Sequence, residues 1–150
     1  MASPVNTSVK WVRSTMPGAP VLTRAVGSLV ALLDALLVNG WGVQTATSVV
    51  VAGGVATATF ASDHAAARHA VVLVAGVTGS LAGLNGEQKV TAVEPNKIKW
   101  ATTEADGTAT GTITIKMAPA GFAKPFSGTN LAAYKSSDPA AHGQFLRITD

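Results

Sequence analysis

The stretch Ser48-Val49-Val50-Val51-Ala52-Gly53-Gly54-Val55-Ala56-Thr57-Ala58-Thr59 decides the fold of this chain. Apolar side chains alternate with period two on either side of the Gly53-Gly54 pair, which is the pattern of half-buried strands. Glycine adopts the positive φ angles that tight hairpin turns require. The stretch therefore predicts a β-hairpin with strands at 47–51 and 55–60.

Short strands are expected to continue after this hairpin. Their predicted positions are 71–75, 88–93, 98–102, 108–117 and 144–148. Glu94-Pro95-Asn96-Lys97 supplies the turn of a second hairpin. In the strand that follows, Lys97 and Lys99 alternate with Ile98 and Trp100, so the lysines are expected on the solvent face. Strands of this length and spacing are typical of a small β-barrel or sandwich.

The first part of the chain has a different pattern. Prolines and glycines over residues 1–21 favour an extended arm with room for one short strand around Trp11. Apolar residues then recur at intervals of three and four, and Asn39-Gly40 is a natural helix stop, so a helix capped by Thr23 is expected at 23–38. The expected fold class is mainly β with one N-terminal α-helix, as a small barrel or sandwich with extended N- and C-terminal segments.

These elements predict three consecutive segments. They are an N-terminal arm and helix at 1–46, a small barrel or sandwich at 47–117, and a C-terminal docking segment with a final strand at 118–150. In the last segment Phe122 and Phe126 flank Pro125, where prolines and Gly121 argue against regular structure. Burying a Phe side chain contributes roughly 1.5–3 kcal/mol, so both rings are expected either to close the core or to insert into a neighbouring subunit. The candidate subunit-interface residues are Trp11, Trp41, Phe122, Phe126 and Tyr134.

The composition favours a protein that is covered by partners. Charged residues make up 13% of the chain, against about 25% in an average soluble domain, and hydrophobic residues make up 47%. A weakly charged surface is typical of one that packs against other subunits, although a small monomer with Ala, Thr and Gly outside is the alternative. The net charge is +3, but the lysines and arginines are scattered, so no nucleic-acid partner is expected.

Groups with catalytic or ligand-binding chemistry are sparse. The chain has no cysteine, and His64 and His69, with Asp63 beside the first, have only His142 and Asp138 as distant additions. These loop histidines are expected to be solvent-exposed, without a metal or catalytic role. Gly79-Ser80 lacks the Gly-x-Ser-x-Gly pattern, and no Gly-Lys-Ser/Thr phosphate loop occurs. We expect no enzyme activity, no cofactor and no small-molecule substrate.

No membrane association is expected either. The N-terminus shows no basic region followed by an apolar stretch, so no signal peptide is predicted. The most apolar run, 29–38, is far shorter than the roughly 20 residues that cross a bilayer.

The hairpin stretch is followed by Asp63-His64, Leu84-Asn85-Gly86-Glu87 and the closing segment 107–115. In this order they resemble a small barrel module of structural proteins from tailed bacteriophages and prophages, although Ala65 stands where that module usually has Gly. The flanks Val9-Lys10-Trp11 and 124–130 agree with uncharacterised proteins of this kind, and the resemblance covers nearly the whole chain. Such proteins often continue further, so this chain resembles a short form or an N-terminal part.

The resemblance implies a non-enzymatic virion component, made in the bacterial host cytoplasm, with no catalytic or ligand-binding residues to carry over. We expect a symmetric oligomer associated with the tail or baseplate, whose partners are other virion proteins and copies of itself. The alternatives are a capsid-associated protein, for decoration or the head-tail junction, and a host-receptor or glycan-binding module. The second alternative would use the loops at 62–70 and 76–88, but neither loop contains an aromatic residue.

Overall fold

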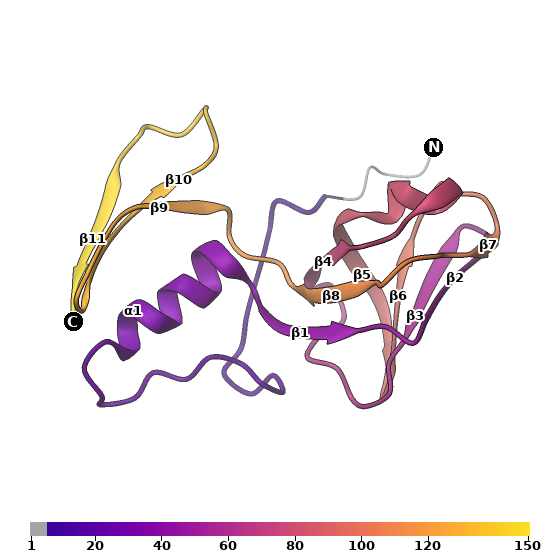
Figure 1. Cartoon of the computed structure of the whole chain (residues 1–150), viewed down its shortest axis with the longest axis horizontal. Helices are drawn as coiled ribbons and strands as arrows, with labels where there is room; N and C mark the ends of the chain where they lie inside the picture. The colour runs from indigo at the N-terminus through magenta and orange to yellow at the C-terminus, as the bar shows by residue number, and fades with distance from the viewer. Residues whose placement is uncertain (1–5) are drawn as a thin grey trace. The chain divides into compact units, whose positions relative to one another are not determined.

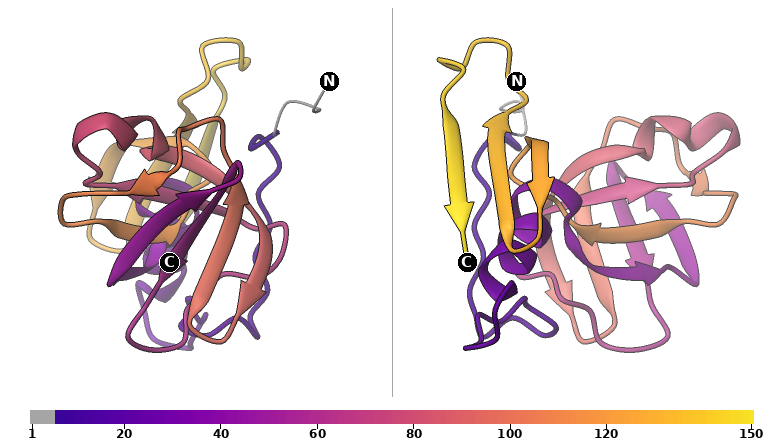
Figure 2. Two further views of the ribbon diagram at one scale, coloured as in Figure 1. Left: turned by 90° about the vertical axis from the view of Figure 1, so that its right-hand side faces the viewer. Right: turned by 60° about the vertical axis from the view of Figure 1, so that its left-hand side comes forward.

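The computed structural model of the chain describes residues 6–150 (Figures 1 and 2). Strands make up 41% of the structure and helical segments 12%. The expected fold class, mainly β with one short helix, is therefore confirmed.

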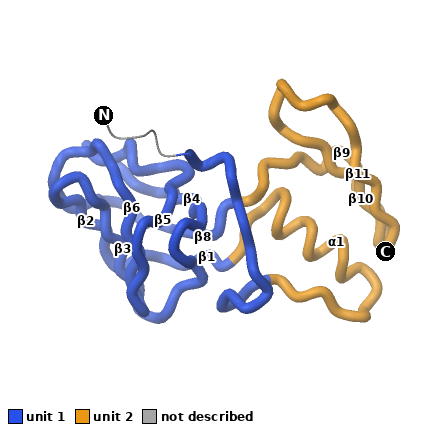
Figure 3. Tube along the Cα trace, turned by 180° about the vertical axis from the view of Figure 1, so that it is seen from behind, with its two compact units in different colours: residues 1–19, 42–118 blue, residues 20–41, 119–150 orange. Residues whose placement is uncertain are grey.

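The chain forms two compact units (Figure 3). Unit 1 contains the residues up to Ala19 and Gly42–Ala118, and unit 2 contains Pro20–Trp41 and Pro119–Asp150. These units do not follow the three consecutive segments predicted above. The N-terminal arm belongs with the barrel strands, whereas the helix belongs with the C-terminal strands.

Unit 1 is built on a curled, antiparallel half-barrel sheet of eight strands in the order β1-β8-β4-β5-β6-β3-β2-β7. The strands are β1 (Trp41–Thr45), β2 (Ser48–Ala52), β3 (Val55–Thr59), β4 (Val71–Ala75), β5 (Gly86–Glu94), β6 (Lys97–Ala101), β7 (Gly107–Thr108) and β8 (Thr114–Met117). A 3-10 helix, η2 (Gly79–Leu84), lies between β4 and β5 in the chain. The first strand, β1, was not predicted.

Both predicted hairpins are confirmed. β2 pairs antiparallel with β3, and Gly53 and Gly54 between them have φ angles of 57° and 76°, as a tight hairpin turn requires. β5 pairs antiparallel with β6 across the second turn. On β6, Ile98 and Trp100 are fully buried while Lys97 and Lys99 alternate with them, so the predicted orientation of this strand is also correct.

The core of unit 1 fills the concave side of the sheet. Because strand side chains alternate, strands such as β2, β3 and β6 contribute every second residue to it. The best-buried members are Val49, Val51, Ala56, Ala58, Val72, Val74, Leu84, Val90, Ile98 and Trp100.

The predicted strand at 108–117 is in fact two strands that lie far apart in the sheet, β7 at one edge and β8 between β1 and β4. β7 pairs with β2, whereas β8 pairs with β4. Between them Gly111 has a φ of 106°, and a Cβ atom at this position would collide with the carbonyl oxygen of Gly76. Only glycine adopts this backbone conformation readily. The positive φ of Gly111 turns the chain out of the extended path, and the predicted strand is interrupted there.

The described part of the N-terminal arm contacts its own barrel. Trp11 Nε1 donates a hydrogen bond to the carbonyl of His69 (3.2 Å), and Lys10 forms an ion pair with Glu87 (3.0 Å). Met16 is buried. The short strand expected around Trp11 does not form, because this segment is anchored by side chains and not by a strand ladder.

The helix of unit 2 is shorter than predicted. It begins at Ser28 as α1 (Ser28–Leu33) and continues as a π-helical segment, η1 (Asp34–Asn39). Gly27, with a φ of 87°, precedes it, and Thr23 caps only a local turn by accepting a hydrogen bond from Ala25 N. The predicted start at Thr23 is therefore wrong, because the left-handed Gly27 interrupts the helical path.

The C-terminal segment forms a small sheet in place of an irregular stretch. β9 (Phe122–Gly128), β10 (Leu131–Ser136) and β11 (Phe145–Thr149) pair antiparallel in the order β11-β10-β9. Of these, only β11 was predicted. Pro125 is accommodated because β9 is an edge strand and the register shifts there, so that Lys124 and Pro125 together oppose Tyr134. Edge strands and bulges are the positions where a sheet tolerates proline.

The core of unit 2 lies between the helix and this sheet. Val30, Ala132 and Tyr134 form its centre, with Leu33, Leu37, Val38, Phe122 and Ile148 packed around them. The Tyr134 hydroxyl donates to Asp34 Oδ1 (2.8 Å) and lies 3.2 Å from the carbonyl of Val30. Lys124 Nζ donates to Asp34 Oδ2 (2.8 Å). Burial, followed by the bond to the Asp34 carboxylate and its charge, raises the pKa of Tyr134 well above the ordinary value.

We expect Tyr134→Phe to lower the free energy of unfolding of unit 2 by about 2 kcal/mol at neutral pH, because a hydrogen bond to a charged group is lost. The pH dependence identifies the cause. An unfolded tyrosine loses its proton near pH 10, whereas folded Tyr134 keeps it, so this contribution is constant below about pH 10 and declines as pH rises further. Denaturant unfolding of both proteins from neutral pH to pH 11 measures this difference. Stability curves that stay parallel above pH 10 would contradict it.

Candidate functional site

Two of the five candidate interface residues belong to the interior of the chain. Trp41 is 6% exposed, and Tyr134 is fully buried with its hydroxyl bonded to Asp34. Trp11 is half-buried through its contact with His69 and carries the guanidinium of Arg13 over its ring at 5.0 Å. The burial of these rings within one chain needs no neighbouring subunit.

The two phenylalanines of the predicted docking segment have different surroundings. Phe122 packs against the core of unit 2. Phe126 lies on the same edge strand but is 54% exposed. The alternative that both rings close the core is therefore wrong for Phe126, which stays a candidate contact residue.

Phe126 belongs to a sheet face that the helix does not cover. Since Ala132 and Tyr134 of β10 point to the helix, the side chains that alternate with them, Ala133 and Lys135, point to the opposite side. Ala133 is paired with Phe126 on one side and Arg147 on the other, and Lys135 is paired with Phe145. We call the set Phe126, Ala133, Lys135, Phe145 and Arg147 the outer face of the small sheet.

The outer face combines exposed rings with cations. Phe145 is 60% exposed, and Lys135 Nζ lies 5.7 Å from the centre of its ring. Arg147 is exposed beside Ala133. Of these residues only Phe126 was predicted from the sequence, because the others are brought to it only by the register of β9, β10 and β11.

A cavity of about 430 Å³ opens at the end of this sheet. Phe145 and Leu146 line it, together with the hydrogen-bonding side chains of Ser136, His142 and Gln144. Phe145 therefore belongs both to the outer face and to the cavity wall. An apolar ring beside several polar groups is suited to a flat, polar-edged ligand group.

A second exposed surface lies on the convex side of the barrel sheet. Val50 and Val55 are 40% and 39% exposed, and the pairing of β2, β3 and β6 places them on one face with Ala52, Thr57 and Ala101. We call these five residues the convex patch. Its members are apolar apart from one hydroxyl. Lys99, which pairs with Thr57 on the same face, lies at its edge and forms an ion pair with Glu94.

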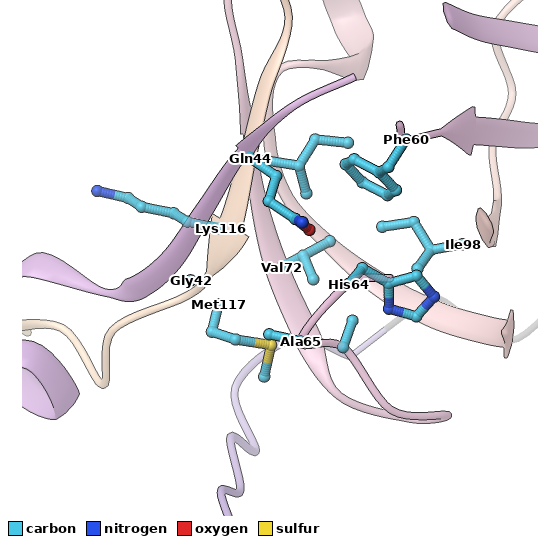
Figure 4. Close-up of a pocket in the computed structure, with 11 residues that line it drawn as sticks. Gly42, Gln44, Phe60, His64, Ala65, Val72, Ile98, Lys116 and Met117 are labelled. Atoms are coloured by element: carbon cyan, nitrogen blue, oxygen red, sulfur yellow. The ribbon is translucent and has the colours of Figure 1, made fainter. Parts of the chain in front are cut away.

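His64 is held inside a loop of unit 1 (Figure 4). Its Nε2 atom lies 2.8 Å from the carbonyl oxygen of Glu94 and 3.0 Å from that of Lys97, and its ring packs at 5.8 Å from that of Phe60. Both partners are acceptors, so Nε2 carries the proton and Nδ1 is left as an acceptor. The expectation that this loop histidine is solvent-exposed is wrong, since it ties the loop to the turn between β5 and β6.

Nδ1 of His64 is buried without a partner among the described residues. Beside it lies a cavity of about 10 Å³, which Gln44, Phe60 and Met117 also line (Figure 4). This volume is close to the space that one water molecule occupies. The arrangement is that of a structural histidine, with one nitrogen bound to the backbone and the other facing a small internal space.

The remaining histidines lie at the surface. His69 and His142 are exposed, and they belong to different compact units. Within residues 6–150, no group of three or more His, Cys, Asp or Glu side chains could hold a metal ion. No helix in that part of the chain is long and apolar enough to cross a membrane.

We expect His64→Leu to lower the free energy of unfolding of unit 1 by about 1–2 kcal/mol, because the turn carbonyls of Glu94 and Lys97 lose their donor. His64→Gln keeps an N–H donor and should lose less, and His142→Ala, at an exposed position, serves as the control. Nitrogen-15 NMR of the wild-type ring should show a proton on Nε2. A ring protonated on Nδ1, or equal stability of His64→Leu and His142→Ala, would contradict this role.

The chain was compared with known protein families, curated proteins and solved structures. No family model, curated protein or solved structure matches the chain. The resemblance to phage structural proteins stays a prediction based on the sequence motifs.

Proposed function

We propose that this chain is a non-enzymatic structural component of a tailed-phage virion, associated with the tail or baseplate and assembled as a symmetric oligomer. The observation that carries the proposal is the convex patch. Val50 and Val55 keep two fifths of their surface exposed, and the nearby charge of Lys99 is balanced by its ion pair with Glu94. Exposed apolar surface of this kind is typical of sites that other protein subunits cover.

Pairing of the convex patch with a second copy would bury the apolar surface of both patches. An apolar patch whose neighbouring Lys99 is already paired with Glu94 can meet an identical patch with little like-charge repulsion, as a two-fold interface requires. The low charge content of the whole chain, 13%, leaves further weakly charged surface for other virion proteins. A capsid-associated position would use the same contacts and is the second candidate location.

A receptor- or glycan-binding module is less well supported. The loops at 62–70 and 76–88 contain no aromatic side chain. Binding hot spots are enriched in Trp and Tyr, and the described tryptophans contribute to the arm contact or to buried positions. Assembly therefore accounts for the surface better than recognition of a host molecule.

The oligomer is tested by light scattering after size-exclusion chromatography over a range of protein concentrations. We expect the wild-type chain to be larger than a monomer, and Val50→Lys with Val55→Lys to shift it towards the monomer by placing like charges in the interface. Thr103→Lys adds one charge at an exposed loop position and should leave the oligomer intact. A wild-type chain that is monomeric at every concentration would contradict the proposed assembly.

The virion location needs a separate measurement. Particles purified by density gradient from the host strain that encodes this chain should contain it in a fixed ratio to the other structural proteins, as measured by quantitative mass spectrometry. Immunogold labelling should place it at the tail end. Intact particles without the chain would refute the location, and label on the head would move it to the capsid.

A further inference from the structure

The outer face of the small sheet has a chemistry different from that of the convex patch. Its two phenylalanine rings are each more than half exposed. Lys135 and Arg147 lie on the same face. Of the described strand residues that share this face, none is acidic.

The carboxylates of unit 2 are engaged elsewhere. Asp34 binds Lys124 and Tyr134 on the helix side of the sheet, and Asp150 accepts a hydrogen bond from the backbone N–H of Leu29. Asp138 accepts one from Ala140 N within its own loop. The positive charge of Lys135 and Arg147 is therefore left for a partner.

This charge argues against a second copy as the occupant. Two identical outer faces would bring Lys135 and Arg147 against the same cations, and like charges in an interface are unfavourable. The fitting partner carries negative charge together with flat apolar groups that can stack on Phe126 and Phe145.

We propose that the outer face of the small sheet binds single-stranded nucleic acid, with bases stacked on Phe126 and Phe145 and phosphates paired with Lys135 and Arg147. Aromatic side chains beside basic ones on a sheet surface are the usual platform for unpaired bases. A duplex does not fit as well, because its base faces are already stacked on one another.

The register sets the scale of this site. Phe126 and Phe145 lie on the two strands that flank β10, opposite residues two positions apart. Strand spacing and rise per residue separate their backbones by roughly 12 Å, so the rings would take two different bases. The small side chain of Ala133 leaves the surface between them open.

A cavity adjoins the site at Phe145, at the end of the sheet, where Phe122 and Ser136 of the helix-covered side also line it. Its volume, about 430 Å³, has room for a base, and Ser136, His142 and Gln144 offer hydrogen-bonding groups at its wall. Base edges carry donors and acceptors that such groups can contact. The scattered cations of the sequence argued against a nucleic-acid partner, whereas the fold gathers two of them beside two exposed rings.

Fluorescence anisotropy with a labelled oligothymidylate of roughly 12 nucleotides tests the proposal, since sites of this kind cover about 4–16. We expect binding at low salt that weakens as salt is added. Phe126→Ala and Phe145→Ala should each reduce affinity about tenfold. Arg147→Gln and Lys135→Gln should each lower the slope of log affinity against log salt by about 0.7. Arg24 is an exposed arginine ahead of the helix. Arg24→Gln is the matched control and should change neither the affinity nor its salt dependence.

Several outcomes distinguish the occupant. Oligouridylate of the same length separates RNA from DNA as the source, and stronger binding of either supports the proposal. A duplex that binds as tightly, or polyglutamate that competes without dependence on the rings, would overturn it in favour of a general polyanion or an acidic protein. Self-association lost in Phe126→Ala would assign the face to a second copy and also overturn it. The convex patch is not part of this face. A failure to bind nucleic acid would therefore leave the proposed oligomer untouched.

Discussion

The curl of the eight-stranded sheet depends on the close approach of the backbone at Gly76 and Gly111. The chain from β7 to β8 passes from one edge of the sheet to a position beside β4, and this path brings it over the end of β4. Thr78 N donates to the carbonyl of Thr110 (2.8 Å), and the Thr110 hydroxyl donates back to that of Thr78 (3.0 Å). Side chains at the two glycines would push these segments apart, because each Cβ would collide with backbone of the other segment. The core residues of the concave side, from Val49 to Trp100, pack inside this curled form.

In unit 2 the interaction that holds the elements together is made by Asp34. Its two carboxylate oxygens join the helical segment to β9 through Lys124 and to β10 through Tyr134. A partly buried carboxylate is unfavourable unless hydrogen bonds and an opposite charge offset its desolvation. Here both are present, and this arrangement fixes which face of the small sheet is covered. The opposite face is consequently the one that exposes Phe126.

The sequence predicted best where local pattern and turn chemistry agreed. The hairpin at Gly53-Gly54 and the alternation of Lys97 to Trp100 needed only neighbouring residues to be interpreted correctly. β9 was missed because Pro125 argues against a strand interior, and only the pairing with β10 shows that it sits at an edge bulge. The break at Gly111 was missed for a similar reason, since the contact that requires it comes from Gly76, far away in the chain.

Surface chemistry was the least predictable feature, because a surface is assembled from residues that are distant in sequence. Lys135 and Arg147 look like two more scattered cations until the register places them on one face with Phe126 and Phe145. Val50 and Val55 look like ordinary strand residues until the curl shows which side is convex. The two surfaces also differ in what they can tolerate. An apolar patch whose neighbouring cation is paired with a carboxylate can meet its own copy, whereas a face with unpaired cations requires an anionic partner. A chain that presents both can take part in a protein shell on one surface and contact a polyanion on the other, without either contact competing for the same residues.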